Sequence, residues 1–152
     1  MHDWRIQLIL VGQIAAAMVL GGVVGWEREL ADKPAGFRTH MLVAGASALF
    51  VGLAAMLTKD FQSILPPGGF RADPVRVLQS VVIGVSFLGA GTVFRSRDNR
   101  VGGLTTAASI LMAAGVGIAC GLSRFILAVG ATLLALLVLR LAHRVVGSRK
   151  KS

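Results

Sequence analysis

Two long apolar runs are joined by the stretch WERELADKPAGFRTH, residues Trp26–His40. The run before it, Ile6–Gly25, contains no charged residue, and neither does the run after it, Met41–Thr58. Each run has the character of a membrane-spanning helix, because a helix needs about twenty mostly apolar residues to cross a bilayer. Charges of both signs are costly to place beside lipid, so we expect the Trp26–His40 stretch to have a task.

The composition indicates an integral membrane protein. Of 152 residues, 55% are hydrophobic and 15% are charged, and the mean hydropathy is +0.74. A soluble domain of this size rarely carries so much apolar surface. The formal net charge is +9, and the basic residues stand beside apolar runs. We therefore expect their partner to be the anionic surface of membrane lipids, and we expect no nucleic acid partner.

Five segments are long and apolar enough, or nearly so, to cross a membrane. They are Ile6–Trp26, Thr39–Thr58, Val75–Phe94, Leu104–Leu122 and Phe125–Ala142. The predicted fold class is an all-α membrane protein with five transmembrane helices. We expect one transmembrane domain over residues 1–146 and a basic cytoplasmic tail over residues 147–152. The first helix is expected to be retained, since it lacks the features of a cleaved signal.

Several connecting segments carry recognisable helix boundaries. Asp73 followed by Pro74 predicts a helix start, with the aspartate as N-cap and the proline as the first helical residue. The segment Gly121–Arg124 predicts a tight hairpin between the last two spans. The first helix is expected to continue past the membrane to about Asp32 and to stop before Pro34.

Lysine and arginine are divided unequally between the two ends of the predicted spans. One end carries eleven of them: Arg28, Lys33, Arg38, Arg95, Arg97, Arg100, Arg140, Arg144, Arg149, Lys150 and Lys151. The other end carries five: Arg5, Lys59, Arg71, Arg76 and Arg124. The positive-inside rule places the larger group in the cytoplasm. With five spans, this puts the N-terminus in the periplasm and the C-terminus in the cytoplasm.

Glycine spacing predicts where helices approach one another. The candidate packing positions are Gly21, Gly25, Gly84, Gly89, Gly91, Gly117 and Gly121. The first two and the last two have the GxxxG spacing, which lets helix backbones come close together. The three in between are so dense that they indicate a close backbone approach or a break in the helix.

A faint internal repeat relates the two halves of the chain. Residues separated by a constant sixty-seven positions match one another: Gly22 and Gly89, Arg28 and Arg95, Gly36 and Gly103, Thr39 and Thr106. Spans one and two would then correspond to spans three and four in the same orientation, a parallel repeat of the kind that some transporters use. The two cytoplasmic loops would face each other, with the fifth span outside.

The functional candidates form a charged cluster drawn from both loops: Glu27, Arg28, Glu29, Asp32, Lys33, Arg38, Thr39, His40, Arg95 and Asn99. On a helix, Arg28 and Asp32 are i,i+4 neighbours, as are Glu29 and Lys33, so each pair is placed to interact. One interpretation is that the charges form interfacial ion pairs that anchor helix ends and set the topology.

A second interpretation gives the cluster a ligand. Glu27, Glu29 and Asp32 place three carboxylates within six residues, and such oxygens suit a hard cation such as Mg²⁺. The arginines could instead bind an anionic group. Because the basic neighbours already neutralise the acids, the metal stays an open question, and no other cofactor is expected. No nucleophile–base–acid set and no Cys/His metal cluster is visible, so we do not expect an enzyme.

Three blocks of the chain resemble, in order, the MgtC/SapB family of bacterial inner-membrane proteins. The first block is Gly25–Glu29 followed by Lys33–His40, the second is Gly84–Arg95, and the third is Gly103–Ala108. The resemblance covers roughly residues 6–142. It implies a polytopic inner-membrane protein without known enzymatic activity, linked to magnesium homeostasis and to adaptation to low Mg²⁺, acid and life inside host cells, including virulence.

The resemblance also implies partners. The name-giving members are thought to restrain the F-type ATP synthase rather than to carry Mg²⁺. They bear a further soluble domain after the last span, and this chain ends at Ser152, so it is expected to be a short form lacking that C-terminal domain.

We therefore expect a non-enzymatic regulator that acts on other membrane proteins through its helices. A homo-oligomer, with a dimer favoured, would bury the glycine faces. The alternative is a transporter or channel for Mg²⁺ or another ion, which the charged cluster and the repeat favour. Against it, no acidic residue lies within a predicted span, and a cation path needs more polar groups. A lipid-binding scaffold is a third hypothesis.

Overall fold

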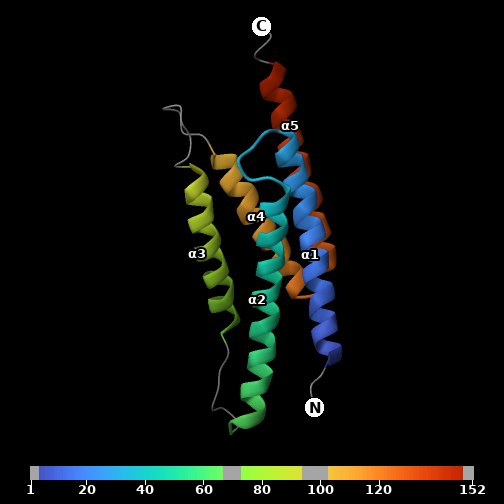
Figure 1. The fold of residues 1–152 in the computed structure, drawn as a ribbon, viewed down its shortest axis with the longest axis vertical. Helices are drawn as coiled ribbons and strands as arrows, with labels where there is room; N and C mark the ends of the chain where they lie inside the picture. Colours follow the sequence, from blue (N-terminus) through green and yellow to red (C-terminus); the bar gives the residue numbers. More distant parts are fainter. Residues whose placement is uncertain (1–3, 67–72, 94–102, 149–152) are drawn as a thin grey trace.

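Five helices make up the part of the chain that the structure describes. A computed structural model describes residues 4–66, 73–93 and 103–148, with side chains as far as residue 141. Its elements are α1 (Trp4–Leu30), α2 (Phe37–Ile64), α3 (Pro74–Val93), α4 (Leu104–Gly121) and α5 (Phe125–Ser148). These described residues contain no strand, so the predicted all-α class is confirmed (Figure 1).

The first four helices are long and apolar enough to cross a membrane. The apolar part of α5, Phe125–Leu141, is shorter than they are, although the helix itself continues to Ser148. The helices lie roughly along one common direction, and α1 begins at the opposite end of the bundle from the end at which α5 finishes (Figure 1). The bundle therefore has the build of a multi-pass membrane protein.

Helix α2 runs further than the apolar pattern predicted. The prediction ended at Thr58, whereas the helix continues to Ile64. Polar residues such as Lys59 and Asp60 end an apolar run but do not end a helix. The helix stops only at Leu65, which is extended (φ −96°, ψ 152°) because it precedes Pro66.

Two helix boundaries follow the predicted chemistry. Helix α3 begins at Pro74, and the Asp73 Oδ1 accepts a hydrogen bond from the Val75 N–H at 3.0 Å, which confirms the N-cap. Helix α4 ends in a Schellman turn in which Ser123 adopts a left-handed backbone (φ 59°). The Arg124 N–H then bonds the Ala119 carbonyl at 2.8 Å, so the predicted tight hairpin into α5 is confirmed.

The same Schellman turn ends α1. The helix stops at Leu30, Asp32 adopts a left-handed backbone (φ 53°), and the Lys33 N–H bonds the Arg28 carbonyl at 3.0 Å. The helix therefore ends two residues before the predicted end at Asp32, because Ala31 and Asp32 belong to the turn. Because Asp32 sits outside the helix, its side chain leaves the face that an i,i+4 partner would share.

Helix α4 is the centre of the bundle, since it contacts all four other helices. Its crossing with α2 depends on glycine: a methyl group on Gly117 would collide with the Ala44 carbonyl oxygen, and one on Gly121 would lie 2.8 Å from the Ala48 oxygen. The core at this crossing consists mostly of small side chains: Ala17, Ala44, Ala48, Val116, Ala119, Cys120 and Ala128. Close backbone approach thus takes the place of large interlocking side chains.

The other predicted packing glycines divide into two groups. A methyl group on Gly21 or Gly25 would come within 2.6–2.8 Å of the backbone of α2, and one on Gly89 would lie 3.3 Å from the Ala107 side chain of α4. Gly84 and Gly91 differ, since no atom lies within 4 Å of such a methyl group at either position. Neither glycine therefore makes a close backbone approach to another described residue, and Gly84 lines an apolar hollow of about 750 Å³ between α2 and α3.

One local contact recurs at the offset of sixty-seven residues. Gly36 and Gly103 stand directly before α2 and α4, respectively. A methyl group on Gly25 would lie 2.8 Å from the Gly36 oxygen, and one on Gly103 would lie 2.7 Å from the Thr92 oxygen. Thr92 is the residue that the offset of sixty-seven matches to Gly25. A residue near the end of the first helix thus contacts the glycine that precedes the second helix, both in the pair α1 and α2 and in the pair α3 and α4.

We predict that Gly117→Ala destabilises the bundle by about 1–3 kcal/mol, because the new methyl group must push α2 away from α4. Equilibrium unfolding in mixed detergent micelles measures this change. Gly115→Ala is the matched control, since a methyl group there meets no atom within 4 Å. Equal stability of the two variants would contradict the predicted crossing.

Candidate functional site

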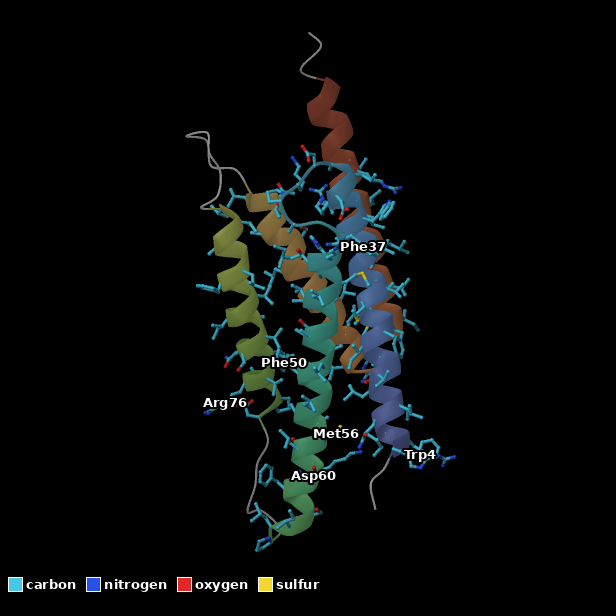
Figure 2. The ribbon with its side chains drawn as sticks, viewed as in Figure 1. Trp4, Phe37, Phe50, Met56, Asp60 and Arg76 are labelled. Carbon is cyan, nitrogen blue, oxygen red and sulfur yellow. The ribbon has the colours of Figure 1, made fainter. Side chains whose placement is uncertain are left out.

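The described part of the charged cluster lies at one end of the bundle, where α1 ends and α2 begins. Phe37, the first residue of α2, marks this end in Figure 2. Arg95 and Asn99, the cluster members from the second loop, lie outside the described residues. The site is therefore built here from α1, α2 and α4.

Glu27 and Arg28 form a buried ion pair. The Arg28 Nε donates to the Glu27 Oε2 at 2.6 Å, and the Nη2 lies 2.5 Å from the same oxygen. Arg28 is 2% exposed and Glu27 is 8% exposed. The predicted Arg28–Asp32 pairing is replaced by this one, because Asp32 lies in the turn and is exposed. Two opposite charges buried together neutralise each other, and neither is spare for a ligand.

Glu29 caps the next helix. Gly36 precedes α2 without a side chain that could cap it, and the Glu29 Oε2 accepts the Phe37 N–H at 2.8 Å. The carboxylate thus meets a free N–H at the positive end of the α2 dipole. The predicted Glu29–Lys33 pairing is replaced by this bond, and Lys33 is exposed. Glu29 therefore fixes the angle at which the chain turns from α1 into α2.

His40 joins α2 to α4. Its side chain is fully buried, with Nδ1 2.9 Å from the Gly36 carbonyl oxygen and Nε2 3.0 Å from the Ser109 Oγ. The carbonyl can only accept, so Nδ1 carries a hydrogen. Ser109 lies on α4, and its hydroxyl also lies 2.8 Å from the Thr106 carbonyl oxygen. A single imidazole thus ties the start of α2 to the centre of the bundle.

This network can satisfy two protonation states of His40. In the neutral ring, Nε2 is an acceptor and takes the single hydroxyl hydrogen of Ser109. In the charged ring, Nε2 donates to the Ser109 oxygen, and the hydroxyl hydrogen is free to bond the Thr106 carbonyl. Rotation of one hydroxyl group would therefore keep the hydrogen bond between His40 and Ser109 in either state.

The three candidate metal ligands do not converge. Glu27 points to Arg28, Glu29 points to the Phe37 N–H, and Asp32 is exposed in the turn. Within residues 4–66, 73–93 and 103–148, no group of three His, Cys, Asp or Glu side chains is arranged to hold a metal ion. Each carboxylate here has a separate environment.

The remaining cluster members lie around this core. Arg38 is exposed and Thr39 is half-buried at the start of α2. Neither Lys33 nor Arg38 forms an ion pair with another residue in the described part of the chain. Both side chains are exposed at this end of the bundle.

Sequence reasoning missed Ser109 and Thr106 as site residues. Both are buried polar residues on α4, at 4% and 1% exposure. They are three residues apart in a mostly apolar helix, and this spacing places them on one face. Two polar residues on one face of a mostly apolar helix could have indicated a buried polar contact. Only the fold shows that this face meets His40.

Comparisons with known proteins agree with this picture. The MgtC family pattern matches residues 14–147. Protein MgtC of Salmonella typhimurium strain LT2 is 39% identical over 136 residues, covering 90% of this chain and 53% of that protein. An Escherichia coli K12 protein named "Putative magnesium transporter YhiD" is 36% identical over 142 residues, covering 93% of this chain and 61% of that protein.

An uncharacterised Haemophilus influenzae protein is 36% identical over 135 residues, covering 89% of this chain and 56% of that protein. The chain thus spans between 53% and 61% of the length of these three relatives. No solved structure matches the chain.

We predict that Ser109→Ala destabilises the protein by about 1–3 kcal/mol, because it leaves a buried imidazole nitrogen without a partner. Unfolding in mixed micelles again measures the change. Ser47→Ala is the control: that serine is equally buried, but its hydroxyl bonds only the Val43 carbonyl within its own helix. Equal losses in the two variants would show that His40 does not depend on Ser109.

A second prediction concerns the buried ion pair. Glu27→Leu or Arg28→Leu alone costs about 3–5 kcal/mol of folding free energy, since each leaves one buried charge unpaired. The double variant should recover much of this loss, and a double-mutant cycle measures the coupling. Additive losses in the double variant would contradict the pairing.

Proposed function

This chain belongs to the MgtC family, and on that premise we propose that it regulates other membrane proteins by binding them through its helices. We place it in the bacterial inner membrane, in adaptation to low Mg²⁺, acid or host stress. The family resemblance names the F-type ATP synthase as the partner to test. The role needs no catalytic group, and we propose none.

The observation that carries this proposal is the self-contained polar core. In the described residues, no buried side-chain nitrogen or oxygen lacks a hydrogen-bond partner. Glu27 is committed to Arg28, and His40 is committed to Gly36 and Ser109. An ion pathway needs polar groups that can exchange their partners for the ion. Buried polar groups that already bond to one another are therefore better suited to a rigid scaffold than to an ion pathway.

Helix α3 supplies the surface for a partner. Among the described helices it packs only against α4 and α2, and Phe87 on its outer side is 79% exposed. A methyl group on Gly84 or Gly91 would meet no described atom within 4 Å, and Gly84 lines the open hollow between α2 and α3, so a second helix could approach this side closely. We propose a second copy of the chain as an alternative partner to the ATP synthase, and the resulting homodimer would form through this side of α3.

Orientation is part of the proposal. The eleven basic residues grouped by the sequence include Arg28, Lys33, Arg38 and Arg140, and the end of the bundle where α1 stops is the end we assign to the cytoplasm. An odd number of crossings agrees with a chain whose first helix starts at one end of the bundle and whose last helix finishes at the other (Figure 1).

The alternative function is a transporter or channel for Mg²⁺ or another ion, which the name of the Escherichia coli relative favours. A pocket of about 400 Å³ between α1 and α2 also fits it, since its mixed lining includes the polar residues Gln7, Gln13, Lys59 and Asp60. Leu10 packs directly onto Gly52 in that pocket, which opposes a continuous path.

Site-specific photo-crosslinking tests the regulator proposal. A photoreactive residue at Phe87 should form an adduct with a membrane subunit of the F-type ATP synthase, or with a second copy of the chain. Ile126 on α5 is the control position, since it is 93% exposed and lies on a different helix. Adducts absent from Phe87, or equally abundant at Ile126, would contradict the proposed surface.

Flux in proteoliposomes tests the alternative. The purified protein should add no Mg²⁺ flux to that of protein-free vesicles. Robust flux that Glu27→Ala abolishes would overturn the regulator proposal in favour of transport.

A further inference from the structure

An apolar groove lies between α1, α2 and α5, at the end of the bundle where α1 stops. Its volume is about 370 Å³. Ten residues line it: Val19, Gly22, Val23, Trp26, Glu27, Leu30, Phe37, Met41, Leu136 and Arg140. A second apolar hollow on α5 shares Leu136 and Arg140 with it. The two hollows therefore adjoin each other along α5.

The groove carries one uncompensated positive charge. Of its two ionised side chains, Glu27 is already paired with Arg28. Arg140 is exposed and forms no ion pair with another residue in the described part of the chain. An arginine near the end of an apolar helix extends to the headgroup level and can hold a phosphate with two parallel hydrogen bonds.

Two aromatic rings, those of Trp26 and Phe37, also line the groove. Trp26 is 57% exposed and contacts Phe37 edge to face, with ring centroids 5.8 Å apart. Tryptophan prefers the boundary between headgroups and hydrocarbon. The groove thus combines an arginine, a boundary tryptophan and an apolar lining, which suit the phosphate, the glycerol region and the acyl chain of a phospholipid.

We propose that this groove binds one anionic phospholipid of the surrounding leaflet. Arg140 pairs with its phosphate, Trp26 lies beside the glycerol region, and an acyl chain occupies the apolar surface along Val19, Val23 and Leu136. The charge favours an anionic lipid over a zwitterionic one, since the latter brings its own cation to compete with the arginine. The lipid would connect α5 to α1 at the edge of the charged cluster.

The chain supplies its own reporter for the test. It contains two tryptophans, Trp4 and Trp26, and Trp4→Phe leaves only the one in the groove. Lipids brominated near the glycerol end of an acyl chain quench an adjacent tryptophan. The experiment compares quenching of Trp26 by brominated phosphatidylglycerol and brominated phosphatidylcholine in mixed vesicles, which yields their relative affinities for the groove.

We expect phosphatidylglycerol to be favoured about fivefold, the effect of roughly one basic residue near a membrane surface. Arg140→Gln should reduce that preference to about one. Arg38→Gln is the matched control, because Arg38 is also exposed at this end but does not line the groove. It should keep the preference.

Two results would overturn the proposal. These are equal quenching of Trp26 by the two lipids, or an equal effect of Arg38→Gln and Arg140→Gln on the preference at Trp26. Val23→Trp in native mass spectrometry provides a second measurement that leaves Arg140 in place. Filling the groove should lower the number of retained anionic lipids by one, and unchanged retention would also overturn the proposal.

Discussion

The close approach of the α2 backbone to α1 and α4 is the constraint on which the rest of the structure depends. Glycine at positions 21, 25, 117 and 121 allows it, since a methyl group at any of them would enter the space of a neighbouring backbone. In lipid, apolar burial adds little to helix association. Close van der Waals contact and buried hydrogen bonds therefore contribute more of the free energy that holds the helices together. The same approach brings His40 within hydrogen-bond reach of Ser109.

The charged cluster follows from that geometry. Once α1 and α2 are pressed together, the turn between them is short, and Glu29 can cap α2 from the end of the preceding helix. Arg28 is buried at the same junction and takes Glu27 as its partner. Charges that looked costly beside lipid are therefore paired or hydrogen-bonded at the end of the bundle where α1 stops and α2 begins. We therefore interpret the buried members of the cluster, Glu27, Arg28 and His40, as structural residues that hold the helices together.

Much of the fold could be predicted from the sequence. The length of the apolar runs and the Asp73–Pro74 cap act locally and place the helices, and the GxxxG spacing indicates which helix faces pack closely. It could not predict the end of α2, since polar residues end an apolar run without ending a helix, and Pro66 lay beyond the run. It also could not predict the partners of Arg28 and Glu29. Their i,i+4 neighbours share a helical face only if the helix continues, and the left-handed turn at Asp32 ends it. Ser109 needed the fold itself, because sixty-nine residues separate it from His40.

Solid-state nitrogen NMR tests the central claim most directly. The protein would carry nitrogen-15 in its arginine and histidine side chains, lie in lipid bilayers and be titrated with Mg²⁺. If the buried polar groups of the cluster bond only to one another, the Arg28 Nε and both His40 ring nitrogens will show hydrogen-bonded chemical shifts that Mg²⁺ does not change. Saturable shifts of these signals with Mg²⁺, as Glu27 exchanges Arg28 for the metal, would contradict the account.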